Sequence, residues 1–380
     1  MIIYCTMKNE YDIILTMKRN IDVEKIKIKI KRKIIENKNT MITIVLGIFV
    51  ITMITITFVI LNSEKKQKYV EYNGENLKEN KYPGYKMLLD EIKSEHPNWK
   101  ITLLYTYLDW EDVIKNEGHK DGIKNPLNLI PKSNKYPEEW KCPVCNGKVY
   151  DNGTWLCASN EAIKHQMDPR NFINEEDMFQ FKELKFEENS QTKEGLKKIV
   201  ENTFLDKESI IDAIIEAGKK ANLDCYFIAS RLIQEQGRKG TILAGGYEYN
   251  EKIVYNPFNI NATGNSSKEI LENAAKYAYE NKWFTLETAL IKGIEFVKEG
   301  YINKGQNTLY LQKFDVIKNE KVKGKNKTNK EKGLYNNQYM QNLFAPLSEA
   351  SNMYEFYKNS NTVDKEASFI IPLYENMDDN

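Results

Sequence analysis

Hydrophobic residues follow three patterns along the chain, and the simplest is one long stretch in which no residue carries a charge. This stretch extends from Met41 to Leu61, and a helix needs about 20 apolar residues to cross about 30 Å of hydrocarbon. A helix buried in a globular core would carry polar residues along one face. The stretch is also longer than the apolar part of a typical export signal, and no small-residue cleavage site follows it. We therefore expect residues 41–61 to be an uncleaved transmembrane anchor.

The second pattern mixes helical and strand-like spacing. Residues 62–81 are polar and have no period, which is typical of a linker. From Tyr85 to Ile92 apolar residues recur at helical spacing, whereas Trp99 to Leu108 is rich in aromatic and apolar residues, as strands are. This mixture continues to a polar stretch near residue 190. We expect residues 82–190 to form a small α+β accessory module.

The third pattern is helical and covers most of the remaining chain. Capping residues precede its apolar stripes, and the predicted helices begin at or just after Asp206, Asp224, Ser267 and Thr285. The helix after Asp224 ends at Gly237, because glycine readily adopts the backbone conformation that terminates a helix. We expect residues 195–358 to form a compact, mainly α domain and residues 359–380 to be a C-terminal tail. The fold class is therefore α+β.

The distribution of charge predicts how the chain is oriented across a membrane, and the net charge bears on whether nucleic acid is a partner. Basic residues are frequent from Lys18 to Lys38, whereas the segment after the apolar stretch mixes Lys with Glu. Because cytoplasmic flanks are enriched in Lys and Arg, we expect a cytoplasmic basic tail at residues 1–40 and an extracellular location for everything after Leu61. The chain carries 55 Lys and Arg against 54 Asp and Glu, so its net charge gives no reason to expect a nucleic acid partner.

Glu235 is the first candidate for catalysis. It lies in the segment ASRLIQEQG, in the last turn of the helix that Gly237 ends. The negative end of the helix macrodipole disfavours an ionised carboxylate there, which suits a general acid for glycosidic cleavage. The segment Tyr255–Asn259 follows and combines aromatic rings with amides, which are the groups that stack on and hydrogen-bond sugars.

These segments belong to a longer series that resembles a known family. The strings ASRLIQEQG, LAGG, YNPFNINATG, GYINKGQNTLYLQKF and QYMQNLFAPLSEA resemble the catalytic domain of bacterial N-acetylglucosaminidases of glycoside hydrolase family 73, a branch of the lysozyme-like α folds. Upstream, YPGYKMLLDEIKSEHPNWKITLLYTYLDWEDVI, NLIP and SNEAIKHQMDPRNFINEEDMFQF resemble the module that precedes this domain in clostridial-type autolysins. The resemblance covers most of residues 82–350.

The resemblance implies a substrate and a set of site residues. It implies hydrolysis of the GlcNAc-β-1,4-MurNAc bond of peptidoglycan without a cofactor for catalysis, with Glu235 as the general acid and Tyr339 as a catalytic residue in the cleft. It also implies that six residues bind substrate: Gln236, Gly237, Tyr255, Asn256, Phe258 and Asn259.

One departure from the family pattern leaves the mechanism open. Many members carry a second acidic residue on a β-rich lobe after the segment that corresponds to Tyr255–Asn259, and the acids available here are Glu248, Glu251 and Glu269. Without a second carboxylate, the acetamido oxygen of the substrate can act as the nucleophile. A lytic transglycosylase or muramidase of lysozyme-like fold, and a catalytically inactive wall-binding protein at the membrane, are the alternative functions.

Three cysteines in the accessory module form a separate candidate site. Cys142 and Cys145 have the spacing of a metal-binding knuckle, and a hairpin around Asp151-Asn152-Gly153 leads to Cys157. With His165 or Cys225 as a fourth ligand, these thiolates would hold a structural zinc ion. A disulfide and free thiols are the competing interpretations.

Overall fold

The computed structural model describes residues 66–119, 125–264, 266–318 and 333–378, together with Lys29, Phe49, Thr52 and Met53. The chain divides into two units, Met1–Lys65 and Lys66–Asn380. Apart from those four residues, the predicted basic tail and the predicted anchor at residues 41–61 lie outside the described part. Within the described part, we find no helix with the length and apolar character that a membrane span requires.

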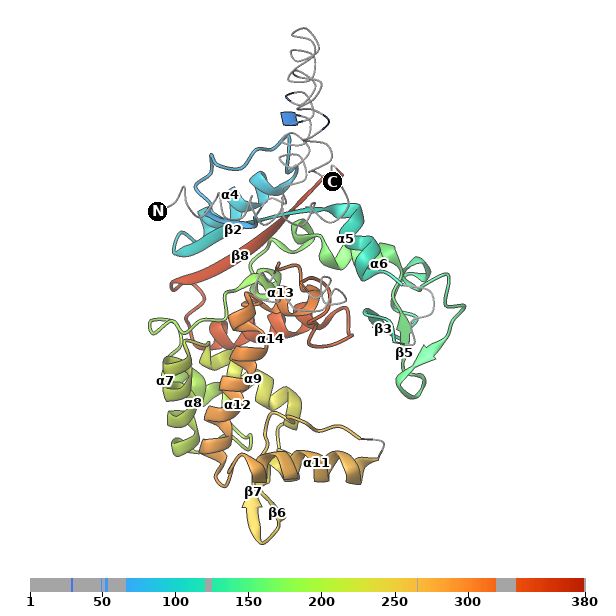
Figure 1. Cartoon of the computed structure of the whole chain (residues 1–380). Coiled ribbons are helices and arrows are strands. Elements are labelled where there is room, and N and C mark those ends of the chain that lie inside the picture. The colour runs from blue at the N-terminus through green and yellow to red at the C-terminus, as the bar shows by residue number, and fades with distance from the viewer. Residues whose placement is uncertain are drawn as a thin grey trace. The chain divides into compact units, whose positions relative to one another are not determined.

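A three-stranded sheet lies at one end of the second unit (Figure 1). Its central strand β2 (Trp99–Asp109) pairs antiparallel with β1 (Lys68–Glu71) and parallel with β8 (Ala367–Glu375). The strand predicted from Trp99 is therefore confirmed. The tail predicted for residues 359–380 is wrong, because β8 is buried along nearly its whole length. The predicted linker at residues 62–81 likewise contains β1.

Short elements surround this sheet and form a lobe to its side. Helix α4 (Tyr85–Glu95) confirms the helix predicted from Tyr85. A small sheet of order β3-β5-β4 contains the predicted hairpin around Asp151-Asn152-Gly153, and we call residues 129–157 the β3–β5 lobe. The other elements of this region are α5 (Trp110–Glu117), β3 (Leu129–Pro131), η1 (Glu138–Trp140), β4 (Val149–Tyr150), η2 (Asp151–Gly153), β5 (Trp155–Cys157), α6 (Asn160–Met167), η3 (Pro169–Phe172) and η4 (Asp177–Phe181).

The remaining elements are mainly helices, as the sequence predicts. They are α7 (Lys193–Val200), α8 (Glu208–Ala221), α9 (Cys225–Gln236), α10 (Ile242–Gly245), β6 (Tyr247–Tyr249), β7 (Lys252–Val254), α11 (Ser267–Glu280), α12 (Leu286–Gly300), η5 (Ile302–Lys304), α13 (Leu309–Phe314) and α14 (Ala345–Asn359). Asp224 and Thr285 cap α9 and α12 as predicted. Asp206 does not cap α8, because its carboxylate accepts the backbone N–H of Asn202 instead.

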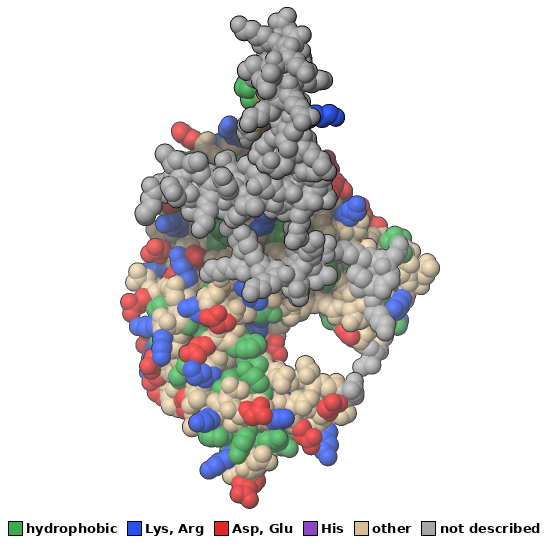
Figure 2. Space-filling view, in the orientation of Figure 1, with side chains coloured by type: hydrophobic (Ala, Val, Ile, Leu, Met, Phe, Trp, Pro, Cys, Tyr) green, Lys and Arg blue, Asp and Glu red, His purple; other side chains and the backbone are tan. Residues whose placement is uncertain are grey.

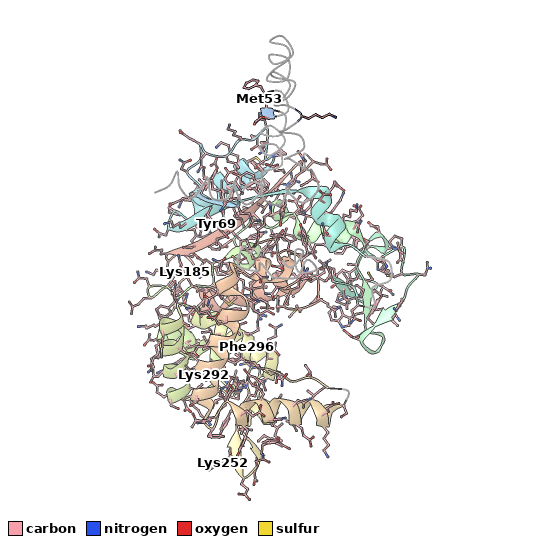
Figure 3. All side chains as sticks on the ribbon, viewed as in Figure 1. Met53, Tyr69, Lys185, Lys252, Lys292 and Phe296 are labelled. Carbon is pink, nitrogen blue, oxygen red and sulfur yellow. The ribbon has the colours of Figure 1, made fainter. Side chains whose placement is uncertain are left out.

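The sheet and most of the helices share one hydrophobic core, which extends from Tyr72 to Met377. A second, smaller cluster lies under β6, β7 and α11, and we call these elements the α11 lobe. Phe258 packs against both clusters. Figure 3 labels Tyr69 of β1 and Lys252 of β7, which lie toward opposite ends of the unit. The α11 lobe therefore projects from the main core rather than forming part of it.

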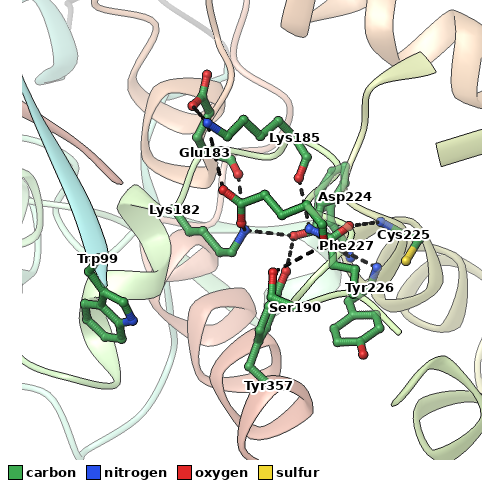
Figure 4. A network of polar contacts seen from close by, with 12 residues as sticks. Trp99, Lys182, Glu183, Lys185, Ser190, Asp224, Cys225, Tyr226, Phe227 and Tyr357 are labelled. Atoms are coloured by element: carbon green, nitrogen blue, oxygen red, sulfur yellow. Dashed lines mark hydrogen bonds and ion pairs between the residues drawn. The ribbon is translucent and has the colours of Figure 1, made fainter. Parts of the chain in front are cut away.

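A buried ion-pair network joins the two predicted domains (Figure 4). The Lys182 ammonium lies 3.2 Å from the Asp224 carboxylate and 3.1 Å from the Glu187 carboxylate. Tyr357 of α14 donates its hydroxyl to Asp224 at 2.6 Å. Burial acts to lower the pKa of Lys182, but the Asp224 and Glu187 carboxylates raise it above its ordinary value. Lys182 is therefore a charged group that the fold compensates internally.

Candidate active site

Helix α9 holds Glu235 at its solvent-facing end. The Asp224 carboxylate accepts the backbone N–H groups of Tyr226 and Phe227 at 2.8 and 3.0 Å, which satisfies donors at the start of the helix. The residues from Cys225 to Leu232 are all buried. The helix ends at Gln236, and Gly237 follows with φ 68°, a left-handed value that favours glycine. The Glu235 side chain itself is exposed, so the chain alone does not desolvate it.

The segment Tyr255–Asn259 forms a turn beside the end of α9, and Asn256 holds that turn together. Asn256 is fully buried, and its amide donates to the carbonyls of Ile260 at 2.8 Å and Ala274 at 3.1 Å. Its side-chain oxygen accepts the backbone N–H of Ile260 at 3.0 Å. The prediction that Asn256 contacts sugar is therefore wrong, because backbone groups of Ile260 and Ala274 already occupy its amide.

Asn259 connects this turn to Glu235. Its amide Nδ2 lies 3.3 Å from the Glu235 carboxylate and donates to it. Gln236 is buried, and its Nε2 donates to the Pro257 carbonyl at 2.8 Å and to Asn259 Oδ1 at 3.0 Å. Gln236 thus orients Asn259, which in turn contacts Glu235. This arrangement corrects the prediction of a substrate contact for Gln236 and gives it a positioning role.

The two aromatic residues of the turn differ in how the fold uses them. The Phe258 ring packs so closely on α12 that a Cβ added at Gly293 would lie 2.0 Å from it. The Tyr255 ring lies against Gly246, where an added Cβ would come within 3.1 Å. Both rings remain partly exposed. They therefore keep part of their apolar surface exposed while they pack against the neighbouring backbone, and their contact with substrate stays a prediction.

Tyr339 contacts a buried pair of charged residues, Arg231 and Glu349. Arg231 lies one helical turn before Glu235 in α9. The Tyr339 ring faces the Arg231 guanidinium at 4.4 Å, and its hydroxyl donates to the Glu349 carboxylate. Arg231 lies 3.0 Å from the other oxygen of Glu349. Burial acts to lower the pKa of Arg231, but Glu349, Tyr339 and Glu235 raise it. The pKa of Tyr339 is raised well above its ordinary value. Burial is the largest cause, and the charge of the Glu349 carboxylate is the second.

Arg231 and Glu349 are residues that the sequence analysis missed, although the sequence contains a signal for both. Each falls on the buried stripe of its helix, α9 or α14, among apolar neighbours. A charge at such a position requires a partner. The candidate second acids lie elsewhere: Glu248 is in β6, Glu251 is between β6 and β7, and Glu269 is in the first turn of α11, all of them exposed.

The surface is open between the β3–β5 lobe and the α11 lobe (Figure 2). Helices α9 and α14 lie on the side of this opening that faces the core (Figure 1). Glu235 contacts Asn259, and Tyr255 belongs to the same turn as Asn259. The cysteines Cys142, Cys145 and Cys157 gather separately in the β3–β5 lobe with His119. His165 packs against Trp140 and Phe172, and Cys225 begins α9, so neither joins them.

Known proteins share both sequence and fold with this chain. Over 200 residues it is 30% identical to a beta-N-acetylglucosaminidase of Bacillus subtilis, and over 176 residues 27% identical to a bifunctional autolysin of Staphylococcus aureus. These matches cover 50% and 43% of the chain but only 22% and 13% of the two relatives, so it spans less than a quarter of their length. No family model matches the chain.

A solved structure gives the fold. The chain aligns with the crystal structure of S. aureus glucosaminidase B at a TM-score of 0.51 and 23% identity, covering 73% of this chain and 93% of that one. The chain therefore shares the fold of that structure over the aligned part, with both helix and strand as predicted. Similarity to N-acetylglucosaminidases thus appears in the sequence over about half of the chain, and in the fold over most of it.

Proposed function

We propose that this chain is a peptidoglycan hydrolase that cleaves the GlcNAc-β-1,4-MurNAc bond with Glu235 as its general acid. The observation that carries the proposal is the position of Glu235: an exposed carboxylate at the end of a buried helix, in contact with Asn259 of a turn that also presents Tyr255. The similarity to a beta-N-acetylglucosaminidase and to a bifunctional autolysin supports the substrate class.

The chemistry follows from this geometry. A glycan strand lying over Glu235 excludes water from the carboxyl group, and the carboxylic acid then donates its proton to the glycosidic oxygen. Asn259 holds the Glu235 side chain at one oxygen and leaves the other for the substrate. In this proposal the acetamido oxygen of the substrate acts as the nucleophile.

The test is product analysis with the full chain. Digestion of purified peptidoglycan should release fragments with reducing GlcNAc ends, which borohydride reduction and mass spectrometry identify. Anhydro-MurNAc ends would instead identify a lytic transglycosylase, and reducing MurNAc ends a muramidase. Either result would overturn the bond assignment.

A substitution then tests the acid. Glu235→Gln should lower activity by about 10²-fold or more, because it removes the proton donor and keeps the shape. Glu216→Gln, an exposed glutamate of α8, is the matched control and should retain full activity. Activity of Glu235→Gln within a few-fold of the wild type would remove Glu235 from the mechanism, and an inactive wild type would favour a wall-binding protein.

The proposed location is the outer face of a cell membrane. The uncharged residues 41–61 would anchor the chain, and the basic residues before them would keep residues 1–40 in the cytoplasm. The site would then face the peptidoglycan that it cleaves.

A further inference from the structure

Four metal-binding side chains from three separate segments converge in the β3–β5 lobe. The ligand atoms of His119, Cys142, Cys145 and Cys157 all lie within 4.8 Å of one another. His119 Nδ1 is 3.3 Å from the sulfur of Cys145 and 3.7 Å from that of Cys157. A tetrahedral zinc ion with bonds of about 2.0 to 2.3 Å places its ligand atoms about 3.5 to 3.8 Å apart. The spacing of the four groups therefore matches one tetrahedral site.

The backbone around Cys142 and Cys145 is shaped to aim both sulfurs at this point. Asn146 and Gly147 adopt left-handed φ values of 46° and 73°, and the backbone N–H of Lys148 donates to the Cys145 carbonyl at 2.9 Å. The Cys142 N–H donates to the Cys157 carbonyl at 3.0 Å, which joins the turn to β5. Backbone hydrogen bonds thus fix the relative positions of the cysteine-bearing segments.

The combination of donors selects among the interpretations that the sequence leaves open. A disulfide would use two of the three sulfurs. It would not explain why the third cysteine and the imidazole of His119 lie beside that pair. Three thiolates with one imidazole are soft ligands, which favour zinc over magnesium or calcium. Four protein ligands fill the coordination sphere and leave no position for a substrate, as in structural sites.

We propose that His119, Cys142, Cys145 and Cys157 bind one structural zinc ion. The fourth ligand is thus His119 rather than His165 or Cys225. Zinc would link the end of α5 to the hairpin of β4 and β5. Because Leu129 of β3 exchanges backbone hydrogen bonds with Gln341 and Leu343 at 2.8 and 2.9 Å, the site would also steady the segment that carries Tyr339. This proposal does not depend on the enzymatic activity.

Metal content gives the first test. The full chain, produced in zinc-supplemented medium and washed free of loose metal, should contain one zinc per chain by inductively coupled plasma mass spectrometry. Cys145→Ser should reduce this content to near zero. Cys225→Ser, which changes a buried cysteine in α9, is the matched control and should keep one zinc. A wild type without zinc, or with two of the lobe cysteines oxidised on thiol titration, would overturn the proposal.

A spectroscopic test covers the case in which Cys145→Ser fails to fold. Replacing zinc with Co²⁺ should produce the visible bands of a tetrahedral site and the charge-transfer absorption of thiolate bonds. His119→Cys should retain the metal and strengthen the thiolate absorption by about one third, because a fourth thiolate joins three. An unchanged Co²⁺ spectrum in His119→Cys would exclude His119 from the site.

Discussion

Glu235 is part of helix α9, whereas Tyr339 lies in the irregular segment before α14, and the two play different parts in the structure. Glu235 reaches solvent and is held by Asn259 of the turn Tyr255–Asn259. Tyr339 contacts Arg231, which lies four residues before Glu235, and donates to Glu349 from α14. The exposed acid therefore lies above a buried layer that combines a cation, an anion and a phenol. Tyr339 belongs to this layer, so we assign it a positioning role.

Removing the hydroxyl of Tyr339 tests what this buried layer contributes to stability and turnover. Tyr339→Phe leaves the Glu349 carboxylate with Arg231 but removes a charge-assisted hydrogen bond, so we expect a loss of about 2 kcal/mol of stability. We also expect a lower kcat with little change in KM when both are measured well below the melting temperature, because the buried layer beneath Glu235 loses one of its hydrogen bonds. Tyr277→Phe, in the second core cluster, should change neither quantity by much. A normal kcat in Tyr339→Phe would confine its role to stability.

The sequence predicts the position of Glu235 better than the roles of its neighbours. The cap at Asp224 and the stop at Gly237 together determine where α9 begins and ends, and so which turn Glu235 occupies. Asn256 and Gln236 differ from the prediction because an amide suits a sugar and a buried backbone carbonyl equally well. Only the three-dimensional packing shows which partner each amide has.

At the scale of elements, α9 depends on the network around Lys182. Asp224 accepts the first N–H groups of the helix with one oxygen and contacts Lys182 and Tyr357 with the other. The same carboxylate therefore caps the helix and compensates the buried ammonium. The segment before α7 and the helix α14 are tied to α9 through this one group.

Removing the cation should destabilise the fold strongly. Lys182→Met leaves the Asp224 carboxylate buried without a cation, and breaking such a pair costs about 3 to 5 kcal/mol. Lys219→Met is the matched control, since Lys219 and Glu188 form an exposed pair and such pairs contribute about 0 to 1 kcal/mol. Thermal unfolding followed by circular dichroism compares the two. Equal melting temperatures would show that the Lys182 network contributes no more than a surface pair.

Strand β8 shows why local pattern alone misplaces an element. Residues 367–374 are apolar on both faces and include Pro372, which makes the segment a poor match to a half-buried strand. Its partner β2 precedes it by more than 250 residues, so no local signal indicates the pairing. The edge position of β8 tolerates Pro372, whereas its buried faces require the apolar run. Helices α9 and α12, in contrast, follow from caps and spacing within their own sequence.

A single substitution tests whether β8 contributes to the hydrophobic core as a strand. Ile371 is fully buried in β8, so Ile371→Ala should cost about 2 to 5 kcal/mol of stability. Glu366→Ala, just before the strand and exposed, should stay within about 0.5 kcal/mol of the wild type. Thermal unfolding of the full chain measures both. If Ile371→Ala melts with the wild type, β8 does not contribute to the core.

At the scale of the whole molecule, the proposed function requires the site to face the cell wall. The asymmetry of charge about residues 41–61 is the physical basis for the orientation, since basic flanks are retained in the cytoplasm. Protease treatment of intact protoplasts should therefore destroy epitopes placed after Leu61 and spare an epitope at the N-terminus. In inverted membrane vesicles the pattern should be reversed.

The charges themselves can be tested as the cause of this orientation. Replacing Lys31, Arg32 and Lys33 with Gln removes basic residues close to the apolar stretch, and it should give a mixed population in which some epitopes after Leu61 are protected. Replacing Lys78, Lys81 and Lys86 with Gln removes basic residues on the other side of the apolar stretch. Because Lys favours the cytoplasmic side, these residues do not contribute to the predicted orientation, and that orientation should persist. Full protection of the later epitopes in the unaltered chain would place Glu235 on the cytoplasmic side, away from peptidoglycan, and would contradict both the orientation and the proposed substrate.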